Sequence, residues 1–170
     1  FEALKGGVIG DPSLFDLLES PPDFDVDEVV RKAIRVKAEI VSADEKEADL
    51  RRLLNYGHTI AHGIESALDY RDLTHGEAVA WGMIGANAIA VRRGLLDRDI
   101  AARIENAVRR WNPTPLPGSI EREAILAATE HDKKNTGSQR VMVFPRAIGS
   151  CEVFADVTED EIAYGVDALL

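Results

Sequence analysis

Apolar residues recur at three- and four-residue intervals along most of this chain, which is the spacing of helices that bury one face. Acidic or hydroxyl residues stand before most of these stretches, where such side chains cap the first free amide groups of a helix. Several are followed three positions later by Glu, as in a capping box. The stretches predicted to be helical are 1–5, 14–19 after a cap at Ser13, 25–41, 44–68 after a cap at Asp44, 78–91, 97–110, 120–130 and 158–170 after a cap at Thr158.

Two of these stretches are expected to form the centre of the fold. Residues 44–68 place Leu, Ile and two histidines along one predicted helix, which we expect to be the central one. Residues 78–91 are small or apolar on nearly all sides. A helix without a polar face is typical of the middle of a bundle, so we expect 78–91 to be buried.

The pattern changes only near the end of the chain. The Pro-rich residues 112–118 predict a loop, and the polar residues 131–138 predict a turn. Residues 140–145 and 151–155 then predict two short strands around Gly149. The predicted fold is mainly α, a helical bundle with one short β-hairpin, formed as a single domain over residues 1–170.

Composition limits the possible functions. The chain is 45% hydrophobic and 29% charged, as in ordinary globular proteins, and its net charge of -10 opposes binding to nucleic acid. Neither a membrane-spanning run nor a signal peptide is predicted. The single cysteine, Cys151, cannot form an internal disulfide, so a cytoplasmic location is expected. Phe1 stands where a complete chain would have Met, and we expect a piece of a longer protein.

Three of the four histidines, His58, His62 and His75, fall within 51–77. His58 and His62 are four positions apart, so on a helix they emerge from the same face. A glycine stands beside each histidine, at Gly57, Gly63 and Gly76. Because glycine weakens a helix by about 1 kcal/mol relative to alanine, we expect something bulky to approach the backbone there.

This cluster predicts a divalent metal site made of His58, His75 and a carboxylate. Two imidazoles and one carboxylate leave coordination positions open for a substrate, as in catalytic zinc sites. The residues alone leave the choice of carboxylate open among Glu2, Glu47, Glu65 and Glu77. The His-Glu-x-x-His pattern of metalloproteases is absent, since Thr59 follows His58. A helical interaction module whose histidines are structural is the alternative that is not an enzyme.

Basic residues supply a second set of candidates, because Lys and Arg bind phosphate and carboxylate groups. The Gly-rich start of the chain lacks the strand, glycine motif and helix of a dinucleotide fingerprint, so the main site of any nicotinamide cofactor is expected elsewhere. The candidates are Lys5, Lys37, Arg51, Lys133 and Lys134.

The histidine region resembles the C-terminal domain of 3-dehydroquinate synthases. The resemblance lies in Leu53-Leu54-Asn55-Tyr56-Gly57-His58-Thr59-Ile60-Ala61-His62-Gly63-Ile64-Glu65 and in His75-Gly76-Glu77-Ala78-Val79-Ala80-Trp81-Gly82-Met83. Weaker matches at 2–5, 44–47 and 132–134 extend it over essentially the whole chain.

The resemblance implies a role for individual residues. Metal ligands are Glu2, His58 and His75, with zinc as the expected ion and cobalt as the alternative. Lys37 and Arg51 meet a substrate carboxylate. The substrate phosphate is surrounded by Lys5, Asn55, His62 and one of Lys133 or Lys134, and catalytic roles fall to Lys5, Glu47 and His62.

The reaction implied is the conversion of 3-deoxy-D-arabino-heptulosonate 7-phosphate to 3-dehydroquinate and phosphate, a lyase step of the shikimate pathway to chorismate and the aromatic amino acids. NAD oxidises a ring hydroxyl transiently in this reaction. The N-terminal NAD-binding domain of the family is missing from the chain, so the chain alone is expected to be inactive. A homodimer is expected from the family.

Two enzyme alternatives remain. One is a related sugar-phosphate cyclase that forms aminodehydroquinate. Valiolone-forming relatives fit less well, because they do not keep both residues that match Asn55 and His62. The other alternative is a metal-dependent polyol dehydrogenase, which would accumulate NADH, whereas a cyclase releases phosphate without net NADH.

Overall fold

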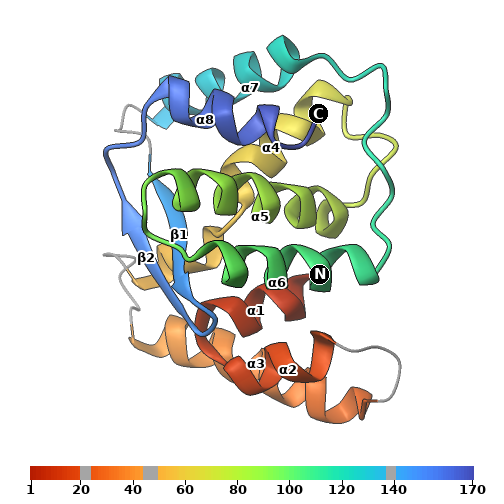
Figure 1. Cartoon of the computed structure of the whole chain (residues 1–170), viewed down its shortest axis with the longest axis vertical. Coiled ribbons are helices and arrows are strands. Elements are labelled where there is room, and N and C mark those ends of the chain that lie inside the picture. Colours follow the sequence, from red (N-terminus) through yellow and green to blue (C-terminus); the bar gives the residue numbers. More distant parts are fainter. Residues whose placement is uncertain (20–23, 44–49, 137–140) are drawn as a thin grey trace.

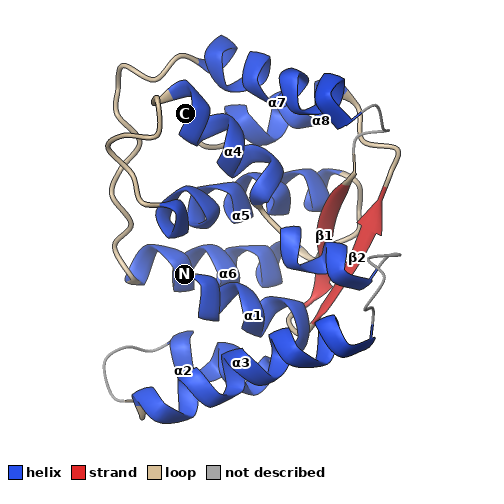
Figure 2. Ribbon diagram, turned by 180° about the vertical axis from the view of Figure 1, so that it is seen from behind, coloured by secondary structure: helices blue, strands red, loops and turns tan. Residues whose placement is uncertain are grey.

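The computed structural model describes residues 1–19, 24–43, 50–136 and 141–170, and of residues 131–136 the backbone only. Helices dominate, and one antiparallel pair of strands lies near the end of the chain (Figures 1 and 2). The predicted mainly α fold with one hairpin is therefore confirmed. The elements are α1 (Glu2–Gly10), α2 (Pro12–Glu19), α3 (Val26–Ala43), the 3-10 helix η1 (Leu50–Asn55), α4 (His58–Ala67), α5 (His75–Arg92), α6 (Arg98–Arg110), α7 (Arg122–Thr136), β1 (Met142–Ala147), β2 (Ser150–Phe154) and α8 (Glu159–Asp167).

Helix α5 occupies the middle of the molecule, as its apolar sequence predicts. It lies between α4 and α8 on one side and α6 on the other (Figure 1). Small residues allow this crowding, because a Cβ on Gly85 would come within 2.9 Å of the Gly165 carbonyl oxygen in α8. The core formed by α5 and its neighbours includes Met83 of α5 together with Tyr56, Ile60 and Phe144, all fully buried.

The predicted continuous helix over 44–68 is wrong. Residues 44–49 lie outside the described part of the chain, and 50–55 form a 3-10 helix. Gly57 then adopts a left-handed conformation with φ of 81°, and α4 begins at His58. Glycine adopts this conformation more readily than residues with a Cβ, so Gly57 can separate the two helices and give α4 its own direction.

Two other predictions need correction. Asp11, rather than Ser13, caps α2, since its Oδ1 accepts from the backbone amides of Ser13 and Leu14 at 3.0 and 3.2 Å. Pro12 fits at the first helical position, where no amide hydrogen is needed. The turn predicted at 131–138 is helical as far as Thr136, because no proline or glycine interrupts the chain before Gly137.

Capping residues define several helix starts. Thr158 and Glu161 form the predicted capping box of α8. Asp97 caps α6, and Asp25 accepts from the Asp27 amide at 2.9 Å before α3. Among the residues described, no helix has both the length and the apolar character needed to cross a bilayer.

The hairpin is anchored to the first helix. Its register pairs Val143 with Val153, and it turns at Gly149, where φ is 85°. The Gly149 amide donates to the Val8 carbonyl oxygen in α1 at 2.9 Å. The hairpin therefore helps to fix α1, which carries the first residues of the candidate site.

A candidate metal centre beside a basic cavity

Three predicted ligands converge in the structure. Glu2, His58 and His75 each offer a ligand atom, and these atoms lie within 4.8 Å of one another. Each residue is the first of its helix, Glu2 in α1, His58 in α4 and His75 in α5. Ligand atoms bonded to one ion at about 2.0–2.2 Å lie somewhat closer together than 4.8 Å, so small side-chain rotations would close this group around an ion. Two imidazoles and a carboxylate are suitable donors for a divalent ion such as zinc.

His58 is held in the form that a metal ligand requires. Its Nδ1 lies 3.2 Å from the Tyr56 carbonyl oxygen, which can only accept a hydrogen bond. Nδ1 therefore carries the proton, and the lone pair is on Nε2. Burial, and then the charge of Lys5, lower the pKa of His58 to about 4. The imidazole is consequently neutral at pH 7.

Glu2 shares its carboxylate with a buried cation. Lys5 Nζ lies 3.0 Å from Glu2 Oε1 and donates to the Leu54 carbonyl oxygen at 2.9 Å. Burial alone would raise the pKa of Glu2, but Lys5 and the two histidines outweigh it and hold that pKa below its usual value. Glu2 is thus ionised at neutral pH, as a ligand must be.

The structure distinguishes three of the four carboxylates that the sequence left open as ligands. Glu2 belongs to the ligand group. Glu65 Oε1 instead lies 2.9 Å from His75 Nδ1. Glu77 accepts from Thr74, with which it forms the capping box of α5, and from Thr114 in the loop after α6. Glu47 lies outside the described residues.

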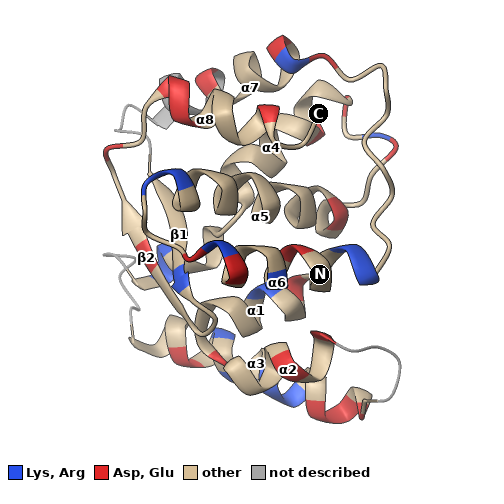
Figure 3. Ribbon diagram, in the orientation of Figure 1, with Lys and Arg blue, Asp and Glu red and all other residues tan. Residues whose placement is uncertain are grey.

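A cavity of about 440 Å³ opens beside the three ligands. Glu2 and His58 line it together with three of the predicted substrate-binding residues, Lys5, Lys37 and Asn55. Two lysines against one glutamate thus make the charged part of a largely apolar lining basic, whereas acidic residues are spread over many elements of the chain, α2, α3 and α8 among them (Figure 3).

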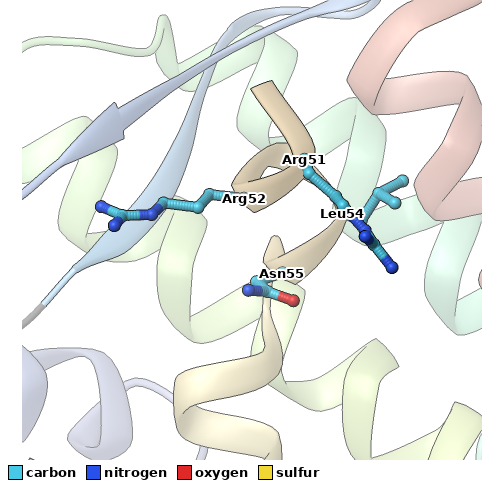
Figure 4. A pocket seen from close by; sticks show the side chains of 4 residues that line it. All are labelled: Arg51, Arg52, Leu54 and Asn55. Atoms are coloured by element: carbon cyan, nitrogen blue, oxygen red, sulfur yellow. The ribbon is translucent and has the colours of Figure 1, made fainter. Parts of the chain in front are cut away.

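Arg51 borders a second cavity. This space, also about 440 Å³, is lined by Arg51, Arg52, Leu54 and Asn55 (Figure 4). Leu54 and Asn55 line both cavities, so the two adjoin along η1. Figure 4 shows the two arginines extending to opposite sides of η1. Arg52 is a lining residue that the sequence reasoning missed, although it directly follows Arg51.

His62 lies next to the ligand group without belonging to it. Its ring centroid is 5.6 Å from that of His58 and 6.3 Å from that of His75. The four-residue spacing thus brings His58 and His62 together on α4, as expected. The side chains of Lys133 and Lys134 lie outside the described part, so both remain predictions.

The glycines beside the histidines make room for other helices. A Cβ on Gly57 would meet the Met83 backbone nitrogen at 2.9 Å, and one on Gly63 would meet the Ile125 carbonyl oxygen at 3.0 Å. For Gly76 the nearest atoms belong to Phe1, at 3.9 Å. The expectation of a close neighbour is therefore correct for Gly57 and Gly63 and wrong for Gly76.

Two solved structures share the fold of this chain. A 2-epi-5-epi-valiolone synthase from Streptomyces hygroscopicus subsp. jinggangensis, solved with NAD+ and Zn2+ bound, matches 99% of this chain and 49% of its own with a TM-score of 0.81 and 30% identity. A 2-deoxy-scyllo-inosose synthase complexed with carbaglucose-6-phosphate, NAD+ and Co2+ matches with a TM-score of 0.75. It is 22% identical and covers 99% of this chain and 50% of its own. At this identity the similarity establishes a shared fold and nothing about activity. This chain thus has the fold of about half the length of each of these two synthases.

The sequence comparisons identify the family. The family model described as 3-dehydroquinate synthase C-terminal matches residues 1–135, and the chain belongs to this family. The 3-dehydroquinate synthase of Solibacter usitatus is 37% identical over 166 residues, 94% of this chain and 46% of the relative. The 3-dehydroquinate synthase of Nostoc punctiforme is 39% identical over 171 residues, which are 95% of this chain and 47% of the relative. The chain thus spans about half the length of these curated relatives.

Proposed function

We propose that this chain is the metal- and substrate-binding part of a 3-dehydroquinate synthase, which converts 3-deoxy-D-arabino-heptulosonate 7-phosphate to 3-dehydroquinate and phosphate in the cytoplasm. The observation that carries the proposal is the convergence of Glu2, His58 and His75 beside a cavity lined by Lys5 and Lys37. The names of the curated relatives support the same reaction.

Glu2, His58 and His75 would hold the divalent ion, with zinc as our first choice and cobalt as the alternative. When bound, such an ion supplies Lewis-acid polarisation of a substrate oxygen. The zinc and cobalt in the two similar solved structures support a divalent ion at this site.

The basic residues would bind the anionic groups of the sugar. Lys5 has two of its three donors directed at Glu2 and Leu54, so one donor remains for a substrate oxygen. Because Lys5 and Lys37 line the same cavity, they can meet a phosphate and a carboxylate on one molecule. Arg51 would reach the carboxylate from the adjoining cavity, where its planar guanidinium favours bidentate contact.

His62 and Asn55 would complete the phosphate site. His62 is exposed beside the ligand group, and an imidazole there would serve as the general acid or base in an elimination of phosphate. Lys133 or Lys134, and catalytic Glu47, remain part of the proposal. We place the main NAD site in the half of the full-length relatives that this chain does not match. We therefore expect that this chain alone does not convert the substrate.

The experiment has a binding arm and an activity arm. The chain, freed of metal by a chelator, should bind one equivalent of Zn2+, and its unfolding temperature should rise with zinc concentration by mass action. Glu2→Ala, His58→Ala and His75→Ala should each lose this response, while His62→Ala should keep it. A wild-type chain without zinc binding would refute the metal site.

For activity, the chain joined to an NAD-binding half from a relative should release phosphate from the substrate without net NADH. Accumulation of NADH on a polyol would instead identify a dehydrogenase. Turnover by the chain alone would refute the assignment of the main NAD site to other residues.

A further inference from the structure

We infer that Glu65 is a positioning residue that orients His75 for the metal and strengthens it as a ligand. This inference rests on the proposed metal site. It assigns Glu65, which the residue pattern offered as a possible ligand, to a different task behind the ligand group.

The first argument is the hydrogen bond between the two side chains. Glu65 Oε1 lies 2.9 Å from His75 Nδ1. A carboxylate can only accept, so the proton is on Nδ1 and the lone pair of His75 is on Nε2. His75 thus offers Nε2 to the ligand group before any ion binds.

The second argument is the burial of the carboxylate. The Glu65 side chain is 10% exposed, whereas that of His75 is 49% exposed. A buried carboxylate loses hydration, a cost that only specific partners offset. Glu65 also lies seven residues after His58, on the same face of α4. One helix therefore supplies a ligand at its start and the support for a second ligand two turns later.

The third argument is the contrast between the two histidines. His58 Nδ1 faces the neutral carbonyl oxygen of Tyr56 at 3.2 Å, whereas His75 Nδ1 faces a carboxylate. A carboxylate behind a histidine makes the ring a stronger donor to a metal, and losing such a partner typically weakens metal binding by about 10–100-fold. His75 should therefore depend more on its partner than His58 does.

The test uses the complete 170-residue chain with two substitutions of similar volume. Glu65→Gln keeps an acceptor and removes the charge, while Glu65→Met removes both. Zn2+ affinity is measured by competition with a chromophoric chelator, and the 15N shifts of the His75 ring report its tautomer in the metal-free chain. Glu77→Gln is the matched control, because it removes a charge two residues from His75 without touching the ring.

We expect Glu65→Met to weaken Zn2+ binding by about 10–100-fold and Glu65→Gln by about tenfold or less, in that order. The metal-free Met variant should also populate the tautomer with the proton on Nε2. Glu77→Gln should change the affinity by less than about twofold. If Met is not tolerated and the variant fails to fold, a weakened Glu65→Gln supports the inference.

Folded Glu65 variants that bind Zn2+ as tightly as the wild type, with His75 still protonated on Nδ1, would overturn the inference and leave the metal site intact. Equal weakening in Glu65→Gln and Glu77→Gln would also overturn it, because the effect would then be one of net charge. A wild-type chain that binds no zinc would instead remove the site itself.

Discussion

Gly82 of α5 lies directly against the backbone carbonyl of Gly57, at the point where α4 begins. A Cβ on Gly82 would overlap that oxygen and would also come within 3.0 Å of the Ala61 amide nitrogen. The two glycines thus let the backbones of two helices touch, and this contact sets where His58 stands relative to the N-terminus of α5.

Gly82→Ala should therefore destabilise the chain although alanine is the better helix former. We expect a loss of about 1–3 kcal/mol in the free energy of unfolding, as for overpacked cores, measured by urea denaturation. Zinc affinity should fall as well, because α4 and its His58 must move. Gly118→Ala is the control, since nothing lies within 4 Å of its added Cβ. Equal stability of the two variants would contradict the close contact.

A buried polar pair lies behind the same turn. The hydroxyl of fully buried Tyr56 donates to Asn87 Oδ1 at 2.5 Å. Among the described residues, Asn87 Nδ2 is the only buried side-chain nitrogen or oxygen without a hydrogen-bond partner. Tyr56→Phe should cost about 1–3 kcal/mol, because it leaves Asn87 wholly unpaired.

The double variant Tyr56→Phe with Asn87→Leu should recover much of this loss, since it removes both polar partners from the core. Thermal unfolding of the four proteins of this double-mutant cycle measures the coupling. Additive effects of the two substitutions would argue against the pair.

Stability should fall in acid through Glu77. Hydrogen bonds from Thr114 and Thr74 lower the pKa of Glu77 from 4.5 to about 2 in the folded chain. Because the folded pKa is the lower one, the contribution is complete above pH 4.5 and disappears as the pH falls towards 2. Glu77→Ala should cost about 1–2 kcal/mol at pH 7 and much less near pH 2. Unfolding curves of the wild type and Glu77→Ala between pH 7 and pH 2 test whether their free energies of unfolding converge in acid.

Arg93 joins α5 to the start of α8. Its guanidinium donates to both carboxylate oxygens of Glu161, at 2.6 and 2.7 Å, and to Asp156 at 2.9 Å, and its side chain is 15% exposed. Arg93→Met should lower the free energy of unfolding by about 2 kcal/mol, a loss between those typical of exposed and of buried ion pairs.

Arg103→Met provides the comparison for Arg93. Arg103 also contacts two carboxylates, those of Asp16 and Glu19, but its side chain is 43% exposed. Solvent screens such pairs, so we expect a loss below about 1 kcal/mol. Chemical denaturation of both variants should separate them, and a larger loss for Arg103 would contradict the role of burial.

Local patterns determine much of this protein. Residues 78–91 are small or apolar on nearly all sides, and that property alone predicts a buried central helix. Thr158 and Glu161 pair with each other's backbone amides at the start of α8, so four consecutive residues predict where this helix begins. His58 and His62 share a face because helix geometry relates residues four apart.

Tertiary structure decides what depends on contacts between distant segments. The break at Gly57 exists because α5 packs against that glycine, and no short window contains both. The same holds for the carboxylates, since Glu2, Glu65 and Glu77 have the same side chain. Only the packing of α1, α4 and α5 brings Glu2 to the histidines and Glu65 behind His75, and only the path of the loop after α6 brings Thr114 to Glu77. Chemical type is local to the sequence, whereas a residue's partner is a property of the folded chain.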